Sequence, residues 1–221
     1  DLRHGHGARD ERGLVGAVFA LAASALATPT KDTRIMRRDI AALHDQLSDL
    51  LARMAKGLRE RPSTGVARAW REEAVDLRNA SIGLGARLED LKSHAKWSPR
   101  IDAEDVETLS REVDATSVMS ARVLSIASDL AAAGTASSAP LPPEAVTPLA
   151  DLMAMAADNI AAEDPVTSLG RTQAHEAVRL ADQTAQIALI GGIVSSINRI
   201  NVASAEAADA AVDETGEHTT T

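Results

Sequence analysis

Large apolar residues recur along residues 32–60 at alternating intervals of four and three positions. The stripe consists of Met36, Ile40, Leu43, Leu47, Leu50 and Met54. This spacing is a heptad pattern of about three repeats, and it requires a partner helix along its length because an apolar stripe must be buried. The pattern therefore predicts a long helix over 32–60 that packs on another helix.

Five further helical segments follow from the same kind of pattern and from the residues that separate them. Proline, glycine and small polar residues interrupt the apolar faces and mark the helix ends. Ser63 or Thr64 is the expected N-cap of one helix, and Asp102 is that of the next. Asp164 followed by Pro165 is expected to open the last helix. The predicted segments cover about 10–27, 65–95, 102–134, 143–162 and 165–205.

Three of these helices have about 30 residues each, which corresponds to roughly 45 Å at the helical rise per residue. The fold class is therefore all-α, an elongated antiparallel bundle of about six helices. We expect a first helical segment over 1–134 and a linker rich in Pro, Ser and Ala over 135–143. A helical hairpin over 144–205 is expected to pack on the first segment, followed by an acidic, unstructured tail over 206–221.

Composition supports helices and narrows the possible chemistry. The chain contains 44 Ala among 221 residues, with 2 Trp, 1 Phe and neither Tyr nor Cys. Alanine favours helices, while the aromatic residues that favour strands are almost missing. Without cysteine there is no disulfide, thiolate metal site or thiol nucleophile. Three aromatic side chains are too few for the stacking surfaces on which single-stranded nucleic acids are held.

Charge is distributed unevenly along the chain. Residues 1–100 contain 18 Lys and Arg against 13 Asp and Glu, a net charge of +5, and residues 101–221 contain 5 against 19, a net charge of -14. The first half therefore suits proximity to an anionic membrane surface, whereas the second half would be repelled from one. With an overall charge of -9 and no reader motif, we expect no nucleic-acid partner.

Two apolar stretches come near the length of a membrane span. The run over 13–27 has about 15 residues, short of the roughly 20 that a spanning helix needs. The stretch over 185–200 is interrupted by Gln186, Asn198 and Arg199. Neither stretch is predicted to cross a membrane.

The sequence contains no familiar catalytic or cofactor motif. Phosphate-binding glycine loops, the nucleophile motif GxSxG and the zinc motif HExxH are absent. A ferritin-like di-iron bundle needs Glu-x-x-His motifs, and none of His44, His94 and His175 has a Glu three residues before it. His4 and His6 supply two ligands at a chain end, too few for a metal site. We therefore expect no catalytic, cofactor-binding or metal site, and a protein that is not an enzyme.

Three ring side chains are assigned structural roles instead. His44 lies beside Leu43 in the stripe and is expected to be a partly buried structural histidine. Trp70 lies on the apolar face of the segment over 65–95 and is expected in the core. Trp97, at the end of that segment near Arg100, is expected to anchor a helix corner or a partner.

We expect contacts between helices to involve residues of the apolar stripes and the two residues at the end of the segment over 65–95, Trp97 and Arg100. The candidate residues are Met36, Ile40, Leu43, Leu47, Leu50, Leu84, Leu88, Trp97 and Arg100. Heptad faces associate with other helices, so we expect them to serve self-association or contact with other helices of the same protein.

One family resemblance is visible in the first part of the chain. RIMRRDIAALHDQLSDLLARMAKGLRERP is followed by ARAWREEAVDLRNA, with Trp70 and the pair Leu77-Arg78, and then by LEDLKSHAKWSPR. These segments resemble the cytoplasmic helical domain of bacterial fusaric acid resistance and aromatic acid exporter proteins. The resemblance covers roughly 10–130.

The resemblance implies a non-catalytic cytoplasmic domain of an inner-membrane efflux transporter of the aromatic acid type. Such a domain would serve subunit association or gating at the cytoplasmic face, and membrane-spanning helices would precede Asp1. The basic first half agrees with this placement, because positive charge next to a bilayer favours the cytoplasmic side. The alternative is a free-standing cytoplasmic helical scaffold or protein-interaction protein, and a bundle that binds a small molecule is a third class.

Overall fold

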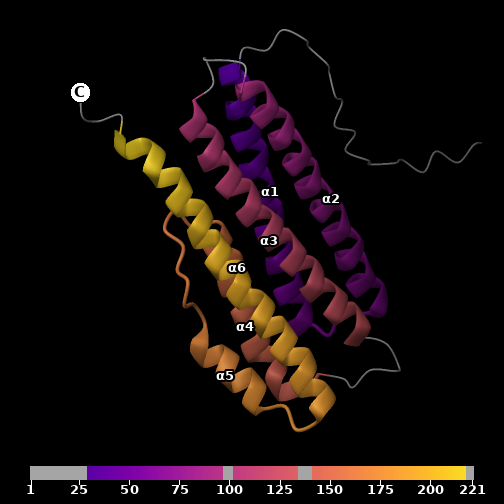
Figure 1. Ribbon diagram of the computed structural model, residues 1–221. Helices are drawn as coiled ribbons and strands as arrows, with labels where there is room; N and C mark the ends of the chain where they lie inside the picture. Colours follow the sequence, from indigo (N-terminus) through magenta and orange to yellow (C-terminus); the bar gives the residue numbers. More distant parts are fainter. Residues whose placement is uncertain (1–28, 97–101, 134–140, 218–221) are drawn as a thin grey trace, which may run out of the picture.

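A computed structural model describes residues 29–96, 102–133 and 141–217. Within these ranges the chain forms six helices and no strand, which confirms the all-α helical bundle (Figure 1). The helices are α1 (Pro29–Arg59), α2 (Thr64–Ala95), α3 (Ala103–Ala133), α4 (Pro143–Ile160), α5 (Arg171–Arg179) and α6 (Thr184–Glu217).

The predicted caps of α2 and α3 are confirmed. Ser63 precedes α2 in an extended conformation, and its Oγ accepts a hydrogen bond of 3.4 Å from the backbone N–H of Val66. Asp102 precedes α3, and its Oδ1 accepts a hydrogen bond of 3.0 Å from the backbone N–H of Glu104. Each side chain satisfies a backbone donor that the first helical turn leaves without a partner.

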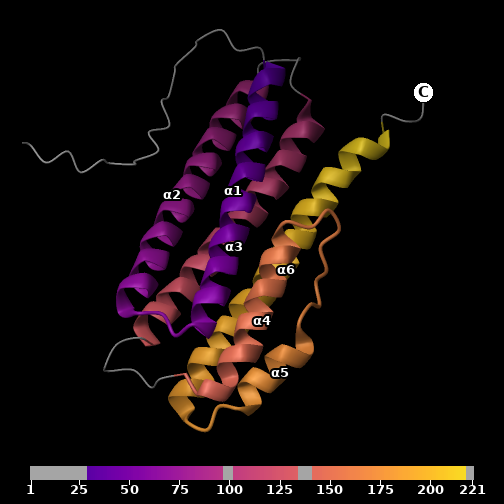
Figure 2. The same cartoon turned by 180° about the vertical axis from the view of Figure 1, so that it is seen from behind.

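The long helices pack in two layers. Figure 1 shows α3 and α6 side by side in front of α1 and α4, with α2 beside α3. Figure 2 shows the opposite side, where α1 and α4 lie in front and α5 lies against the lower end of α4. The most extensive contacts join α3 to α6, α2 to α3 and α1 to α4. Residues 143–217 therefore complete the core of the first three helices instead of forming a separate one.

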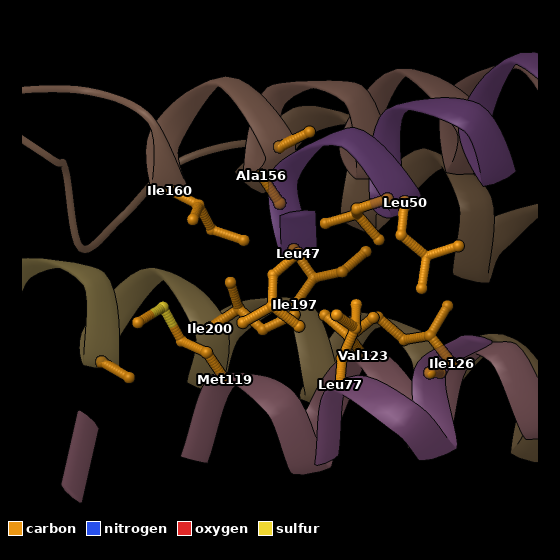
Figure 3. Close-up of a cluster of buried hydrophobic side chains, with 14 of the residues drawn as sticks. Leu47, Leu50, Leu77, Met119, Val123, Ile126, Ala156, Ile160, Ile197 and Ile200 are labelled. Atoms are coloured by element: carbon orange, nitrogen blue, oxygen red, sulfur yellow. The ribbon is translucent and has the colours of Figure 1, made fainter. Parts of the chain in front are cut away.

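The predicted stripe of α1 forms the centre of this core. Leu47, Leu50, Leu51 and Met54 are completely buried. Figure 3 shows Leu47 and Leu50 in one cluster with Val123 of α3 and Ile197 of α6. Each fully buried leucine side chain contributes about 2 kcal/mol to stability through removal of its surface from water.

The last predicted helix, over 165–205, is wrong in its bounds. The structure divides this segment into α5 and α6, and residues 161–170 form turns and bends. Asn159 explains why no helix begins at Pro165, because its side-chain amide bonds both the N–H and the C=O of Val166. These hydrogen bonds stabilise a non-helical backbone at Val166 and compete with the helix start that Asp164 and Pro165 favour.

The acidic tail predicted from residue 206 also differs from the structure. Helix α6 continues to Glu217, and Ala207 and Ala210 are buried. The physical reason is that alanine and glutamate favour a helix and that small alanines fit close to a neighbouring helix. The predicted helix over 10–27 lies outside the described residues.

Among the described residues one segment, Thr184–Ala211 of α6, is long and apolar enough to cross a membrane by length and composition. Its apolar side is used within the bundle, because Ile190, Ile193, Ile197 and Ile200 are completely buried. The core helix of a bundle meets the same criterion of length and composition.

Gly57 of α1 lies against the indole ring of Trp70 of α2. A Cβ atom at this position would lie 2.5 Å from Cζ2 of Trp70 and 2.6 Å from its Cη2. Trp70 is 6% exposed and belongs to the core, as predicted. The indole ring therefore occupies the space that any other residue at position 57 would need.

We expect Gly57→Ala to lower the free energy of unfolding by about 1–3 kcal/mol, because the new methyl group overpacks the contact with the Trp70 ring. Gly83 of α2 is the matched control, since a Cβ there meets nothing within 4 Å. Gly83→Ala should raise stability by up to about 1 kcal/mol through helix propensity alone. Urea unfolding measures both, and equal stabilisation by the two substitutions would contradict the close contact.

Candidate functional site

A partly buried polar contact joins α1 to α3 at His44. The Nε2 atom of His44 lies 2.8 Å from Oγ1 of Thr116, and the Thr116 hydroxyl donates a hydrogen bond of 2.7 Å to the carbonyl oxygen of Glu112. Because the hydroxyl proton is engaged by Glu112, His44 must be the donor to Thr116. In its neutral form the His44 imidazole therefore carries its proton on Nε2.

The surroundings of His44 favour this neutral form. Burial lowers the pKa of His44 below its ordinary value of 6.5, and the opposing effect of the Asp45 carboxylate is smaller. Thr116 is completely buried and its proton is committed to the backbone. The pair joins two helices, and the predicted structural role of His44 agrees with this geometry.

Protonation of His44 gives the fold a dependence on pH. The unfolded chain takes up a proton at His44 near pH 6.5, whereas the folded chain does so at lower pH, so the unfolded chain binds more protons between the two values. The free energy of unfolding therefore falls as the pH falls through this window. We expect His44→Gln, which keeps a donor near Thr116, to reduce this loss of stability.

Urea unfolding of wild type and variant at about pH 7.5 and about pH 5.5 measures the effect. The effect of carboxylate titration on stability is the same in wild type and variant, so it cancels when the two proteins are compared. The control is His175→Gln, because His175 lies exposed on α5. An equal loss of stability in wild type and in His44→Gln would contradict this assignment.

A second buried polar contact joins α4 to α6. The Nδ2 atom of Asn159 donates to Oδ1 of Asn201 at 3.1 Å and to the carbonyl oxygen of Val166 at 3.2 Å. The backbone N–H of Val166 donates to Oδ1 of Asn159 at 2.8 Å. Asn201 is completely buried, and its Nδ2 makes no hydrogen bond to the described residues. Asn159 thus fixes the segment between α4 and α5 against α6.

Arg78 joins α2 to α3 through neutral acceptors. Its Nη1 atom donates to the carbonyl oxygen of Ser117 at 2.9 Å, to Oγ of Ser117 at 2.8 Å and to Oγ of Ser120 at 3.3 Å. Arg78 belongs to the Leu-Arg pair on which the family resemblance rests. At this position the motif serves a contact between helices.

Ion pairs at the surface join α1 to its neighbours. Arg53 pairs with Glu73 of α2 at 2.5 Å, Arg59 with Asp151 of α4 at 2.5 Å, and Arg87 of α2 with Asp39 at 2.6 Å. In each ion pair at least one of the two side chains is more than one third exposed. Each pair therefore contributes roughly 0–1 kcal/mol to stability. Arg53 and Arg59 of α1 are thus used in contacts between helices.

The structure places the predicted stripe residues inside the chain's own core. Trp97 and Arg100 lie outside the described residues. Buried side chains have little surface to offer a second chain, so contacts with other chains have to involve exposed residues of the bundle. The buried members of the candidate set are Met36, Ile40, Leu43, Leu47, Leu50, Leu84 and Leu88.

The polar contacts of His44, Arg78 and Asn159 join helices. Across 29–96, 102–133 and 141–217, no group of three or more His, Cys, Asp or Glu residues is placed to hold a metal ion. No protein-family model matches the chain, and neither a curated protein nor a solved structure matches it.

Asn159 and Asn201 were not predicted from the sequence. Both continue an apolar face, Asn159 three residues after Ala156 on α4 and Asn201 four residues after Ile197 on α6. An amide on an apolar stripe is a signal of a buried hydrogen bond, because an unpaired polar group costs free energy there. Which two amides meet becomes known only when the packing of α4 on α6 is known.

Proposed function

We propose that this chain is the non-catalytic cytoplasmic domain of an inner-membrane efflux protein of the aromatic acid type. In this role it serves subunit association or gating through contacts between helices. The observation that carries the proposal is the arrangement of the segments on which the resemblance rests. They form the antiparallel pair α1 and α2, and Arg78 of that pair connects directly to α3.

The charge distribution supports the same role. The helices α1 and α2 belong to the basic half of the chain, and α3 to α6 belong to the acidic half. Positive charge on one pair of helices favours the cytoplasmic side of a bilayer with anionic lipids. The acidic helices would then point away from the lipid headgroups.

A free-standing scaffold protein is the second candidate. The observation that favours it is the closed core, which the described helices complete among themselves without a further chain. Such a bundle needs no membrane-spanning partner for its stability. The two proposals differ in what the gene encodes before Asp1.

The nucleotide sequence upstream of the Asp1 codon separates the two proposals. We expect an in-frame stretch that encodes several apolar segments of about 20 residues each, as membrane-spanning helices require. A start codon directly upstream, with no such stretch, would contradict the transporter role and leave the scaffold.

A further inference from the structure

On the outer face of the bundle, α3 and α6 lie side by side, and we call the line along which they meet the seam. Three exposed residues of α3 each lie opposite an exposed residue of α6 at this seam. Glu206 and Asp114 form the first pair, Val202 and Val118 the second, and Arg199 and Arg122 the third. The four charged residues are exposed, Val118 is 39% exposed and Val202 is 36% exposed. Figure 1 shows these two helices side by side on the near face of the molecule.

Two contacts fix the register in which these residues face each other. A Cβ at Gly192 would lie 3.7 Å from Oδ2 of Asp129, and Oγ of Ser204 lies 3.3 Å from Sδ of Met119. From the first contact to the second, the residue number increases on α6, from 192 to 204, and decreases on α3, from 129 to 119. The two helices are therefore antiparallel. Seven residues, two helical turns, separate Asp129 from Arg122 and Gly192 from Arg199, which places the two arginines at the same level.

The three pairs form an ordered band of negative, apolar and positive groups. Along α3 the order is Asp114, Val118 and Arg122, each one turn from the next. The carboxylate and the guanidinium on one helix are therefore about 12 Å apart along its axis and cannot pair with each other. Along α6 the same order is given by Glu206, Val202 and Arg199.

The four charged groups at this seam have no partner within the described part of the chain. Asp114, Glu206, Arg122 and Arg199 form neither an ion pair nor a side-chain hydrogen bond there. Two arginines at one level, and two carboxylates at another, also repel each other across the seam. Ion pairs elsewhere on the surface show that this bundle does pair exposed charges when partners are within reach.

We infer that the outer face of α3 and α6 binds a second copy of this chain across a two-fold axis. The axis runs parallel to this face and perpendicular to the two helices, at the level of Val118 and Val202. Rotation by half a turn about such an axis places Arg122 on Asp114 of the second copy and Arg199 on Glu206 of the second copy. The valines of the two copies meet at the centre. A two-fold interface requires this self-complementary order, in which residue i meets j and j meets i.

The extent of the contact follows from the residues beyond the band. The same rotation brings Arg111 opposite Ser125, and Arg111 is already held by a hydrogen bond of 3.3 Å to Oγ1 of Thr108. One turn further, Glu107 and Asp129 would face each other with like charge. The close contact is therefore expected to end within about three turns of its centre, a small interface with a correspondingly weak association.

The pairing goes beyond the proposed function and does not depend on it, since a scaffold protein would use the same face. The upstream gene sequence tests the transporter role, whereas solution mass tests the pairing. Failure of one leaves the other standing.

Sedimentation velocity over a range of protein concentrations tests the pairing. We expect the wild-type chain to dimerise, more strongly at low salt than at high salt, because exposed charges are screened by salt. Arg122→Glu should weaken the dimer at least about tenfold, because like charges then meet across the axis. The matched control is Arg171→Glu, which makes the same charge change at an exposed site on α5 and should leave dimerisation unchanged.

A reciprocal exchange distinguishes pairing from a general effect of charge. The double variant Arg122→Asp with Asp114→Arg reverses the order of charges on α3 and so restores opposite charges across the axis. We expect it to recover most of the dimerisation lost in Arg122→Glu. All positions are exposed, and circular dichroism and thermal unfolding verify that the variants fold.

Two outcomes would overturn the inference. One is a wild-type chain that stays monomeric up to its solubility limit. The other is a dimer that Arg122→Glu and Arg171→Glu affect equally, which would assign association to another surface.

Discussion

We expect Leu47→Asp to abolish the native bundle. Leu47 is completely buried at the centre of the core cluster, between α1 and the other long helices (Figure 3). Loss of a buried leucine side chain costs about 2–5 kcal/mol. Burial of a carboxylate without a partner costs several kcal/mol more, or forces the group to take up a proton. The sum is comparable to the roughly 5–15 kcal/mol by which a native domain is stable.

The matched control for this substitution is Gln46→Asp. Gln46 is the preceding residue of α1 and is exposed, so an aspartate there should change the free energy of unfolding by less than about 0.5 kcal/mol. Circular dichroism and the midpoint of urea unfolding measure both variants. A native-like unfolding transition for Leu47→Asp would contradict the placement of the stripe in the core.

Gly170→Ala is expected to lower the free energy of unfolding by about 2–4 kcal/mol. Gly170 precedes α5 with a φ of 74°, in the left-handed region that glycine adopts without steric cost. A Cβ at this position would also overlap Cδ1 of Leu152, which is 1% exposed on α4. Backbone strain and steric overlap therefore act together at one site.

Gly85→Ala is the control, because a Cβ at Gly85 of α2 meets nothing within 4 Å and the residue is helical. It should be neutral or stabilising by up to about 1 kcal/mol. Thermal unfolding monitored by circular dichroism measures both proteins. If Gly170→Ala unfolds at the wild-type temperature, the left-handed conformation and the contact with Leu152 are both wrong.

The helices of the first half were predictable because local signals and packing agree there. Ser63 and Asp102 cap their helices as expected, and the heptad positions of α1 are the buried ones. Periodicity identifies a face that must be buried, and a cap residue identifies where a helix begins. Neither signal depends on knowing which helices are neighbours.

The second half was less predictable because contacts distant in sequence override local signals there. Asp164 and Pro165 have the sequence pattern of a helix start, but the side chain of Asn159 holds the backbone of Val166. The Ala-rich end of α6 lacks large apolar residues, yet Ala207 and Ala210 are buried by close packing. Local propensity is a weak guide where such tertiary contacts compete with it.

The arrangement of charged residues on the outer face of α3 and α6 could not be derived from the sequence, because it also depends on contacts between distant segments. Arg122 and Arg199 are far apart in the chain, and their common level depends on the register of two antiparallel helices. His44, in contrast, was predictable as a structural residue, because its place beside the α1 stripe already implied partial burial.

Accumulation of a labelled aromatic carboxylate in bacteria that express the complete gene tests the proposed efflux role most directly. We expect cells with the complete gene to retain less of the compound than cells with the empty vector. Deletion of the codons for residues 29–217 should remove this difference. Equal accumulation with and without the complete gene would contradict the role in efflux.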